Sequence, residues 1–323
     1  MREYVYDFHQ FTASSSAVET ELNEAQLRAV IVKEYHRLEK GLALPSPRVG
    51  FGRFVVNALF NLVPRYETRF GAAAVTEEAR AALHQYRASP WCASDLAGRI
   101  DAFLQATPAE TLPAAGAMSV RRDAIRKSSM VDFAAFAESR YSVRDFTGEQ
   151  VPPAAIREAV SIAMKSPRVC NRGTTRCHAA FDPAVRARAL ALQNGNAGFG
   201  DLAGAVLVIT SSRHGFTDFG ERNQCWVDGG LFAMSLNYAL HAAGYGTCML
   251  NWSALSSRDR ALRHALGISE DEAIITMMAV GVMKEAFQVA ISPRERVEHV
   301  FHILDGDIPD LSEGSIAPIA SGP

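Results

Sequence analysis

The spacing of apolar residues divides the chain into a helical first part and a mixed second part. In residues 22–40, apolar side chains recur every three or four positions, which predicts an amphipathic helix. We expect Gly41 to end this helix, because glycine commonly follows the last helical residue. Two further helices are expected over residues 76–87 and 93–105, the first with Thr76 as its N-cap.

After about residue 150, segments with helical and strand-like patterns alternate. The continuous aliphatic runs at residues 205–210 and 274–281 predict buried strands, and a short strand is expected at 177–181. Helices are expected between them, over residues 154–165, 183–193 and 224–243. This alternation indicates an α/β or α+β protein whose sheet is covered on its faces.

The two parts are joined by a segment of linker-like composition. Residues 107–117 contain two prolines and one glycine among small residues. We therefore predict a helical N-terminal extension, residues 1–117, and a second domain, residues 118–323. Residues 312–323 are expected to form a frayed polar tail.

Composition and charge exclude several classes of protein. With 48% hydrophobic and 21% charged residues among 323, the chain has globular composition. With a formal net charge of −2, the chain lacks the excess of positive charge that nucleic-acid-binding proteins carry. The longest apolar candidate, residues 54–63, is interrupted by Asn57 and Asn61, so no membrane span is expected. Residues 1–10 lack the apolar core of a signal peptide.

The cysteines and histidines do not suggest a metal site. The five cysteines are widely spread and form no Cys-x-x-Cys pair, so we expect reduced thiols in a cytoplasmic protein. His36 and Glu39 have the i, i+3 spacing of a surface ion pair on a helix, and we prefer that reading to a metal site.

Asp228, near the start of the apolar segment 224–243, is expected to be an N-cap or an interface residue.

A basic segment offers the first candidate chemistry. Residues 139–144 read Ser-Arg-Tyr-Ser-Val-Arg, so Arg140 and Arg144 could converge on one anion with a hydroxyl between them. A solvated polar turn would show the same spacing. Late in the chain, Arg294 and Arg296 could add positive charge if the fold brings them near.

Two loops offer further polar groups. In residues 166–172, Asn171 lies beside arginines, and its amide could both donate and accept hydrogen bonds to a hydroxyl or a heterocycle edge. A loop that only ends a helix is the plainer reading. In residues 243–252, Gly244 and Gly246 should turn the chain sharply, so that the following backbone N–H groups could face a flat ligand.

Together, the order and spacing of these segments resemble the FMN-dependent nitroreductase family over residues 130–304. The resemblance implies an α+β fold, an α/β/α sandwich that binds FMN. It also implies these cofactor-binding residues: Arg140, Tyr141, Ser142, Arg144, Pro167, Arg168, Val169, Asn171, Asn196, Met249, Leu250, Asn251, Trp252, Arg294 and Arg296.

The resemblance gives each group a role. The segment at 140–144 and either Arg294 or Arg296 would hold the phosphate and ribityl chain. The loop at 167–171 would come from a partner subunit and lie along the flavin ring. Asn196 would bind the pyrimidine edge. Residues 249–252 would cover the ring and offer a backbone N–H near N5.

The loop also departs from the family pattern. Arg168 stands where the family often has Ser, and Gly173-Thr174 stands where it has Gln-Pro. These positions would lie over the substrate face of the flavin. We therefore expect Arg172 and Arg176 to bind substrate and to favour an anionic one.

The implied activity is an oxidoreductase reaction in which FMN accepts hydride from NAD(P)H at N5 and then reduces an unidentified small-molecule acceptor, by a ping-pong mechanism. No catalytic side chain is expected, because the flavin carries the chemistry. A homodimer with FMN at its interface is implied. The alternatives are a flavin-binding or partner-binding module without turnover, and an enzyme of flavin fragmentation or biosynthetic oxidation.

The N-terminal extension has a resemblance of its own. Residues 36–42, His-Arg-Leu-Glu-Lys-Gly-Leu, are similar to a segment of the extension on some nitroreductase-like proteins of polysaccharide-biosynthesis gene clusters. The extension could cap the active site, extend the dimer interface or bind a partner.

Overall fold

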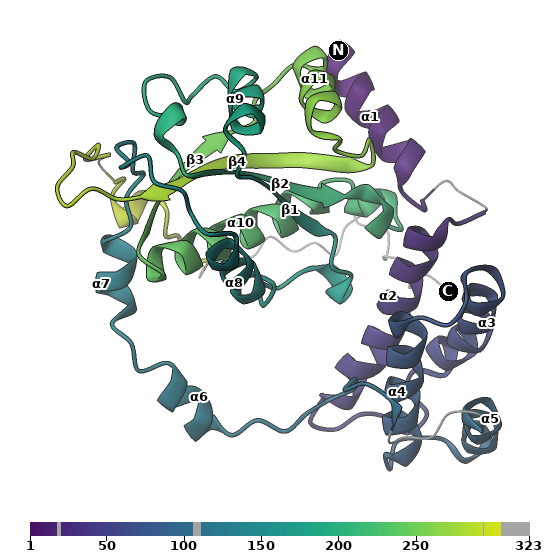
Figure 1. The fold of residues 1–323 in the computed structure, drawn as a ribbon. Helices are drawn as coiled ribbons and strands as arrows, with labels where there is room; N and C mark the ends of the chain where they lie inside the picture. Colours follow the sequence, from purple (N-terminus) through teal and green to yellow (C-terminus); the bar gives the residue numbers. More distant parts are fainter. Residues whose placement is uncertain (18–20, 106–110, 293, 305–323) are drawn as a thin grey trace. The chain divides into compact units, whose positions relative to one another are not determined.

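The computed structural model describes residues 1–17, 21–105, 111–292 and 294–304 (Figure 1). The described residues fall into two compact units, which divide after Val289. Residues 107–110 of the expected linker and the whole expected tail, 312–323, lie outside the described residues. No described helix is both long and apolar enough to cross a lipid bilayer.

The described helices and strands follow one another in this order: α1 (Arg2–Ser14), α2 (Glu24–Leu42), α3 (Arg53–Phe70), α4 (Ala74–Ala88), α5 (Ser94–Leu104), α6 (Arg122–Ser128), α7 (Phe133–Glu138), α8 (Pro153–Ala163), β1 (Thr175–Ala180), α9 (Pro183–Ala191), β2 (Ala205–Ser212), α10 (Gln224–Ala242), β3 (Tyr245–Asn251), α11 (Ser256–Leu266) and β4 (Glu272–Val282).

The strands form one antiparallel sheet in the order β1-β2-β4-β3. β2 is a central strand and every one of its residues is buried, which explains its uninterrupted aliphatic sequence. Its Leu207 pairs with Met278 of β4, and its Ile209 pairs with Cys177 of β1. The strands expected from the aliphatic runs are therefore confirmed. β3 is an additional edge strand where the sequence indicated only a turn and an exposed backbone.

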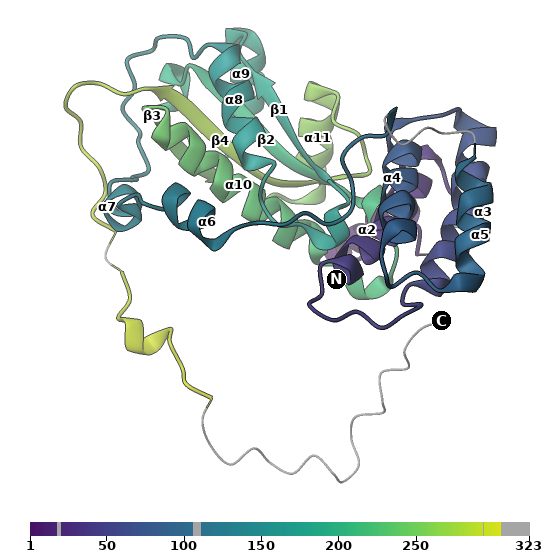
Figure 2. The same cartoon turned by 90° about the horizontal axis from the view of Figure 1, so that it is seen from below.

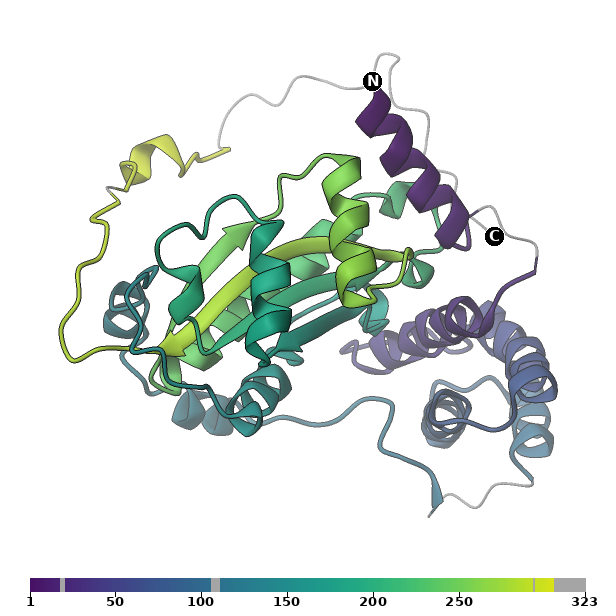
Figure 3. The same ribbon diagram turned by 45° about the horizontal axis from the view of Figure 1, so that its top comes forward.

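Helices cover both faces of the sheet (Figures 1 and 2). On one face, Ile156 of α8 and Leu236 of α10 pack in a cluster with Leu207 of β2. On the other face, Leu262 of α11 packs in a cluster with Val208 of β2, together with residues of α9. Figure 3 shows α9 and α11, in teal and light green, lying across this second face. The predicted α/β/α sandwich is confirmed.

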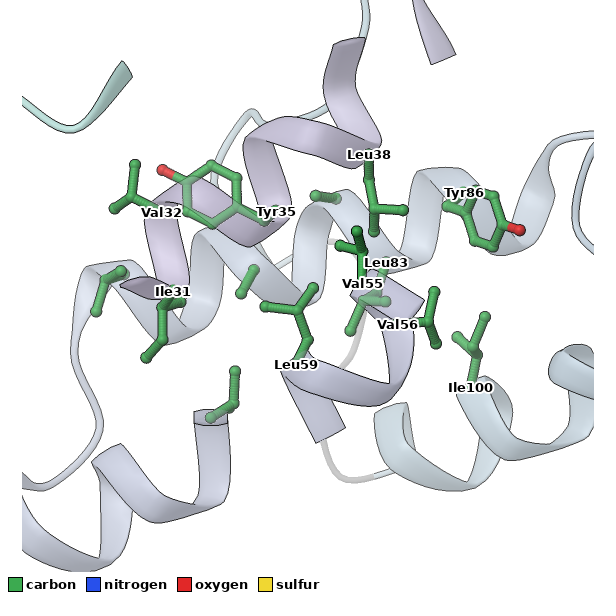
Figure 4. Packing of buried hydrophobic residues seen from close by; sticks show 14 of the residues in the cluster. Ile31, Val32, Tyr35, Leu38, Val55, Val56, Leu59, Leu83, Tyr86 and Ile100 are labelled. Atoms are coloured by element: carbon green, nitrogen blue, oxygen red, sulfur yellow. The ribbon is translucent and has the colours of Figure 1, made fainter. Parts of the chain in front are cut away.

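The helical N-terminal region has an apolar core of its own (Figure 4). It is built from fully buried side chains of four helices: Ile31 and Leu38 of α2, Leu59 of α3, Leu83 of α4 and Ile100 of α5. Each of these helices places one apolar stripe toward the others, as amphipathic helices do when they pack together. The expectation of a mostly helical N-terminal region is confirmed.

Two predicted helix ends were wrong. α2 does not stop at Gly41 but continues to Leu42, and Gly41 is buried inside the helix. It is a glycine because the Phe51 ring occupies the space that a Cβ would need. Thr76 is not the N-cap of α4, which begins after Ala73; its hydroxyl instead donates to the Ala73 carbonyl at 2.9 Å.

The Gly41→Ala substitution is therefore expected to destabilise the fold, by about 1–3 kcal/mol through overpacking. In an open helix the same change would stabilise by about 1 kcal/mol, because alanine has the higher helix propensity. Gly98→Ala is the matched control: Gly98 lies inside α5, and a Cβ there would meet open space. Urea denaturation of both variants should show changes of opposite sign in the free energy of unfolding. Changes of the same sign would contradict the role of Phe51.

α1 packs against the sandwich rather than in the core of α2–α5. The Tyr6 hydroxyl donates to the Asp259 carboxylate at 2.9 Å, and the Ser256 N–H donates to the Glu3 carboxylate at 2.7 Å. Both partners belong to α11, so Glu3 caps the N-terminus of a distant helix. The N-terminal region and the sandwich thus share contacts, and the division at residue 117 stays a prediction.

The second compact unit is described from Ala290 to residue 304, apart from residue 293. It contains one short 3-10 turn, Val297–His299. All its described residues are exposed, Arg294 and Arg296 among them, and Arg296 Nε contacts Glu298 Oε2 at 3.3 Å.

Candidate functional site

The basic segment at 139–144 is fixed along the outer edge of β3. The Val143 N–H donates to the Thr247 carbonyl at 2.8 Å, and Ser142 forms an isolated parallel bridge with Thr247. Gly246 permits this close approach, because a Cβ at that position would collide with Val143 and Met283. The segment's position is therefore set by a backbone pairing and by a glycine in the neighbouring strand.

Two positive charges lie on this segment. Arg140 is half-buried and Arg144 is exposed, one on either side of Ser142. The neighbouring Asp145 is paired with Lys284 at 2.6 Å. Over the described ranges, no carboxylate lies within ion-pair distance of Arg140 or Arg144. Both guanidinium groups therefore have charge available for an external anion.

The same segment reaches the end of α10. The Ser139 hydroxyl lies 2.8 Å from Nε2 of His241. Burial lowers the pKa of His241, and the nearby positive charge of Arg140 lowers it further. A neutral imidazole beside Arg140 avoids repulsion between like charges.

The predicted ring-covering residues lie on β3 and just after it. Because peptide groups alternate along a strand, Met249 and Asn251 direct their N–H groups to the same outer edge as Thr247. Met249 is 36% exposed, whereas Leu250 is buried in the sandwich. The outer edge of β3 thus offers an apolar side chain and backbone N–H groups beside the basic segment.

Two other predicted ligands use their polar atoms inside the fold. The Trp252 indole N–H donates to Asp259 Oδ1 at 2.9 Å. The Asn196 amide donates to the carbonyls of Leu190 and Gln193, each at 2.8 Å, and so closes the turn after α9. These bonds tie both side chains to the layer of α9 and α11, and their role toward a flavin stays a prediction.

The loop between α8 and β1 has an unusual backbone. Cys170 and Asn171 have φ angles of 45° and 55°, the left-handed region that few residues other than glycine occupy. The Val169 N–H bonds to both carboxylate oxygens of Asp228, at 3.2 and 3.3 Å, and Arg168 Nε donates to Asn171 Oδ1 at 3.0 Å. The loop is therefore tightly folded and anchored to α10.

Asp228 is the anchor of this loop. Of the two roles expected for it, the N-cap was wrong, and the interface role stays a prediction. α10 begins at Gln224 with Asn223 as its N-cap, so Asp228 lies one turn inside the helix. The Gln224 amide donates to Asp228 Oδ1 at 2.9 Å. Burial raises the pKa of the Asp228 carboxyl, and its bonds from Gln224 and Val169 offset only part of this cost. An acid inside an apolar helix is the sequence signal that could have identified the anchor.

The two predicted substrate residues have different surroundings. The Arg172 side chain is fully buried and forms a two-pronged ion pair with Glu221, with an Nη1–Oε2 distance of 3.0 Å. Arg176 is exposed, and its Nη1 donates to the carbonyls of Gly173 and Thr175, each at 2.9 Å. Arg172 is therefore committed to a carboxylate of its own chain, whereas Arg176 faces solvent.

The predicted residues form two separate groups in one chain. The group at 139–144 and 249–251 lies along β3, whereas the loop at 167–176 leads into β1. β2 and β4 lie between these outer strands, which is three inter-strand spacings or about 14 Å. A single copy of the chain does not bring the two groups together. Arg294 and Arg296 belong to the second compact unit.

A cavity of about 380 Å³ adjoins the second group. Its lining includes Arg168, Asn171, Arg172 and Arg176 of the predicted set. The N-terminal helices also line it, through Arg28, Tyr35 and Glu78, which sequence reasoning missed. No local signal marks these three residues, because their relation to the loop exists only in the folded chain.

The expected pairing of His36 with Glu39 on α2 is confirmed as a contact, with His36 Nδ1 and Glu39 Oε2 2.7 Å apart. In the part of the chain that the structure describes, no three His, Cys, Asp or Glu side chains are grouped as metal ligands would be.

Comparison with known proteins locates one family match. Residues 184–282 match the model of the nitroreductase family, a segment that runs through α9, β2, α10, β3, α11 and β4. The predicted resemblance is confirmed for this segment. No curated protein matches the chain.

Solved structures of similar fold include three from bacteria. A nitroreductase family protein from Streptococcus pneumoniae has 16% identity and a TM-score of 0.46, over 53% of this chain and 100% of its own. An FMN-dependent nitroreductase from Clostridium difficile has 17% identity and a TM-score of 0.42, over 49% and 92%. A nitroreductase-like protein from Streptococcus mutans has 18% identity and a TM-score of 0.47, over 54% and 98%.

Proposed function

We propose that the protein is an FMN-dependent oxidoreductase of the nitroreductase family, which takes electrons from NAD(P)H and passes them to a small-molecule acceptor. The observation that carries the proposal is the pair of arginines, Arg140 and Arg144, held at the outer edge of β3 without carboxylate partners among the described residues. The family match over residues 184–282, which includes β3, supports it.

The residues present fit FMN. Its phosphate is a dianion, and guanidinium groups on both sides of the Ser142 hydroxyl match such a group in charge and hydrogen-bonding capacity. Met249 offers an exposed apolar side chain and an outward backbone N–H beside them, as a flat ring with one polar edge requires. When bound, FMN would supply the redox chemistry, accepting a hydride and releasing electrons to the acceptor. The side chains described would bind and orient it.

We further propose a homodimer with FMN between its subunits. Val227, Leu231 and Met234 of α10 are 52%, 42% and 36% exposed, and their spacing places them on one face of the helix. Ile162 and Met164, at the end of the adjacent α8, are each 56% exposed. Exposed apolar side chains gathered on two adjacent helices are typical of a protein interface. A partner's loop at 167–176 could then complete the site along β3, which one chain leaves open.

We also propose a cytoplasmic location. All five cysteines are free thiols in the structure. Burial raises the pKa of Cys177 to about 12 and that of Cys225 to about 11, so these thiols stay protonated and unreactive. Unpaired cysteines are typical of a reducing compartment.

The visible spectrum of the purified full-length protein tests the activity. We expect a yellow protein whose flavin absorbance is bleached by NADH or NADPH without oxygen, because the two arginines retain FMN and the edge of β3 leaves its ring accessible. Colourless protein that takes up no added FMN would contradict the proposal. Bound FMN that neither donor reduces would favour a flavin-binding module without turnover. Product analysis after aerobic turnover would identify flavin fragmentation or a biosynthetic oxidation.

A further inference from the structure

The cavity of about 380 Å³ is bounded by three parts of the first compact unit. Arg28, Val32 and Tyr35 form one wall, and their spacing places them on a single face of α2. Residues of the loop at 167–176 form a second wall. Val160 of α8 and Phe232 of α10 add apolar surface. The volume lies within the range of about 300–1,000 Å³ that is typical of small-molecule sites.

The polar lining of this cavity carries an excess of positive charge. Arg28, Arg168 and Arg176 all line it, and none of them has a carboxylate within ion-pair distance in the described ranges. The fourth arginine, Arg172, is neutralised by Glu221. The single carboxylate in the lining is Glu78. The unpaired arginines thus outnumber the acid, which leaves the cavity electropositive.

The carboxylate in the cavity, Glu78, already accepts a hydrogen bond within the fold. The Tyr35 hydroxyl donates to Glu78 Oε2 at 2.8 Å. Burial raises the pKa of Tyr35, and the Glu78 carboxylate raises it further, so the phenol stays protonated and keeps donating. Glu78 therefore has Tyr35 as its hydrogen-bond donor and is not paired with Arg28. The Arg28 guanidinium is thus available to a ligand.

We propose that this cavity binds a small organic anion, with a carboxylate held by Arg28 and Arg176 and a flat apolar body resting on Val160 and Phe232. The N-terminal helices would then take part in ligand binding, because α2 supplies one of the two arginines and an apolar wall. Within the proposed function, on which this last clause rests, the anion is the acceptor that the enzyme reduces.

Calorimetric titration of the full-length protein with 2-naphthoate and with its uncharged amide, 2-naphthamide, tests this binding. We expect naphthoate to bind at least about tenfold more tightly than the amide, because two charge-assisted hydrogen bonds depend on the carboxylate. In the double variant R28Q R176Q, this preference should disappear. The affinity for naphthamide should be unchanged, because the apolar wall is intact.

The matched control is R65Q R188Q, which removes two exposed arginines, from α3 and α9, outside the cavity. It should bind naphthoate as the wild type does, and circular dichroism should show all variants folded. Equal binding of naphthoate and naphthamide to the wild type would overturn the inference. So would a double variant that keeps the preference. Flavin content, read from the absorbance of the same samples, tests the proposed function separately from the anion site.

Discussion

Replacing Glu221 by glutamine is expected to lower the free energy of unfolding by about 3–5 kcal/mol, because it leaves the Arg172 charge buried without a counter-ion. The Arg172 side chain has no exposed surface, whereas that of Glu221 is 19% exposed. The guanidinium also lies over the Phe216 ring, 5.8 Å from its centroid, so its surroundings are partly apolar. Urea denaturation of the full-length protein, followed by circular dichroism, measures the loss.

The control for this prediction is Glu158→Gln, which removes the same charge from an exposed position on α8. Its stability should stay within about 0.5 kcal/mol of the wild type, as is usual for surface substitutions. An E221Q variant that is as stable as E158Q would show that the pair contributes no net stability.

The same pair predicts a pH dependence. Burial alone would raise the pKa of Glu221, but hydrogen bonds from Arg172 and from the Thr217 N–H, with the Arg172 charge, bring it below the ordinary value of 4.5. A carboxyl whose pKa is lower in the folded state stabilises the fold above its unfolded pKa and loses this contribution as the pH falls toward the folded value. The wild type should therefore lose more stability than E221Q as the pH falls below about 4.5.

The pair also shows where reasoning from sequence stops. The sequence predicts that Arg172 meets a substrate, and its local sequence, Asn-Arg-Gly, contains nothing that reveals Glu221, which follows 49 residues later. Asn196 is a similar case, because its side-chain amide donates a hydrogen bond to a backbone carbonyl at the end of α9. A side chain's residue type indicates which bonds it can form, but the folded chain decides which partner it meets.

The elements that could be predicted are those whose burial follows one simple period. β2 is buried at every position, so its sequence is aliphatic throughout. α11 escaped prediction because it is largely polar, and its buried positions include Arg263, which is paired with Asp259 at 2.7 Å. β3 escaped because Gly246, needed for the approach of Val143, made the segment resemble a turn.

The residue types of the basic segment indicate a possible phosphate site, because guanidinium groups bind phosphate oxygens well, although the spacing alone fits a polar turn equally well. The structure adds its place beside β3 and shows which charges are available. The separation of the two groups could not be predicted, since strand order is set by pairing across the whole domain. That separation supports the proposed dimer and makes it testable.

Two variants of the protein, one altered in the basic segment and one altered in the loop at 167–176, are each expected to lose FMN. A mixed dimer that contains one chain of each variant is expected to bind FMN again. R140Q R144Q removes the charges beside β3, which should weaken FMN binding by about a hundredfold or more, since each charge-assisted hydrogen bond contributes about 1.5–3 kcal/mol. R168A N171G alters the loop, and glycine suits the φ of 55° at Asn171. Each purified variant should be colourless.

Co-expressed with different tags, the two variants should give mixed dimers that contain one intact site and one site altered on both sides. Random pairing places about half of the chains in such dimers, so the total flavin should recover to about a quarter of the wild-type amount. The control R122Q R126Q, which removes two exposed arginines of α6, should retain FMN. If each chain held its own flavin, mixing would recover none, because every chain would carry a defective site. Recovery in the doubly tagged fraction therefore requires that the loop of one subunit complete the β3 edge of the other.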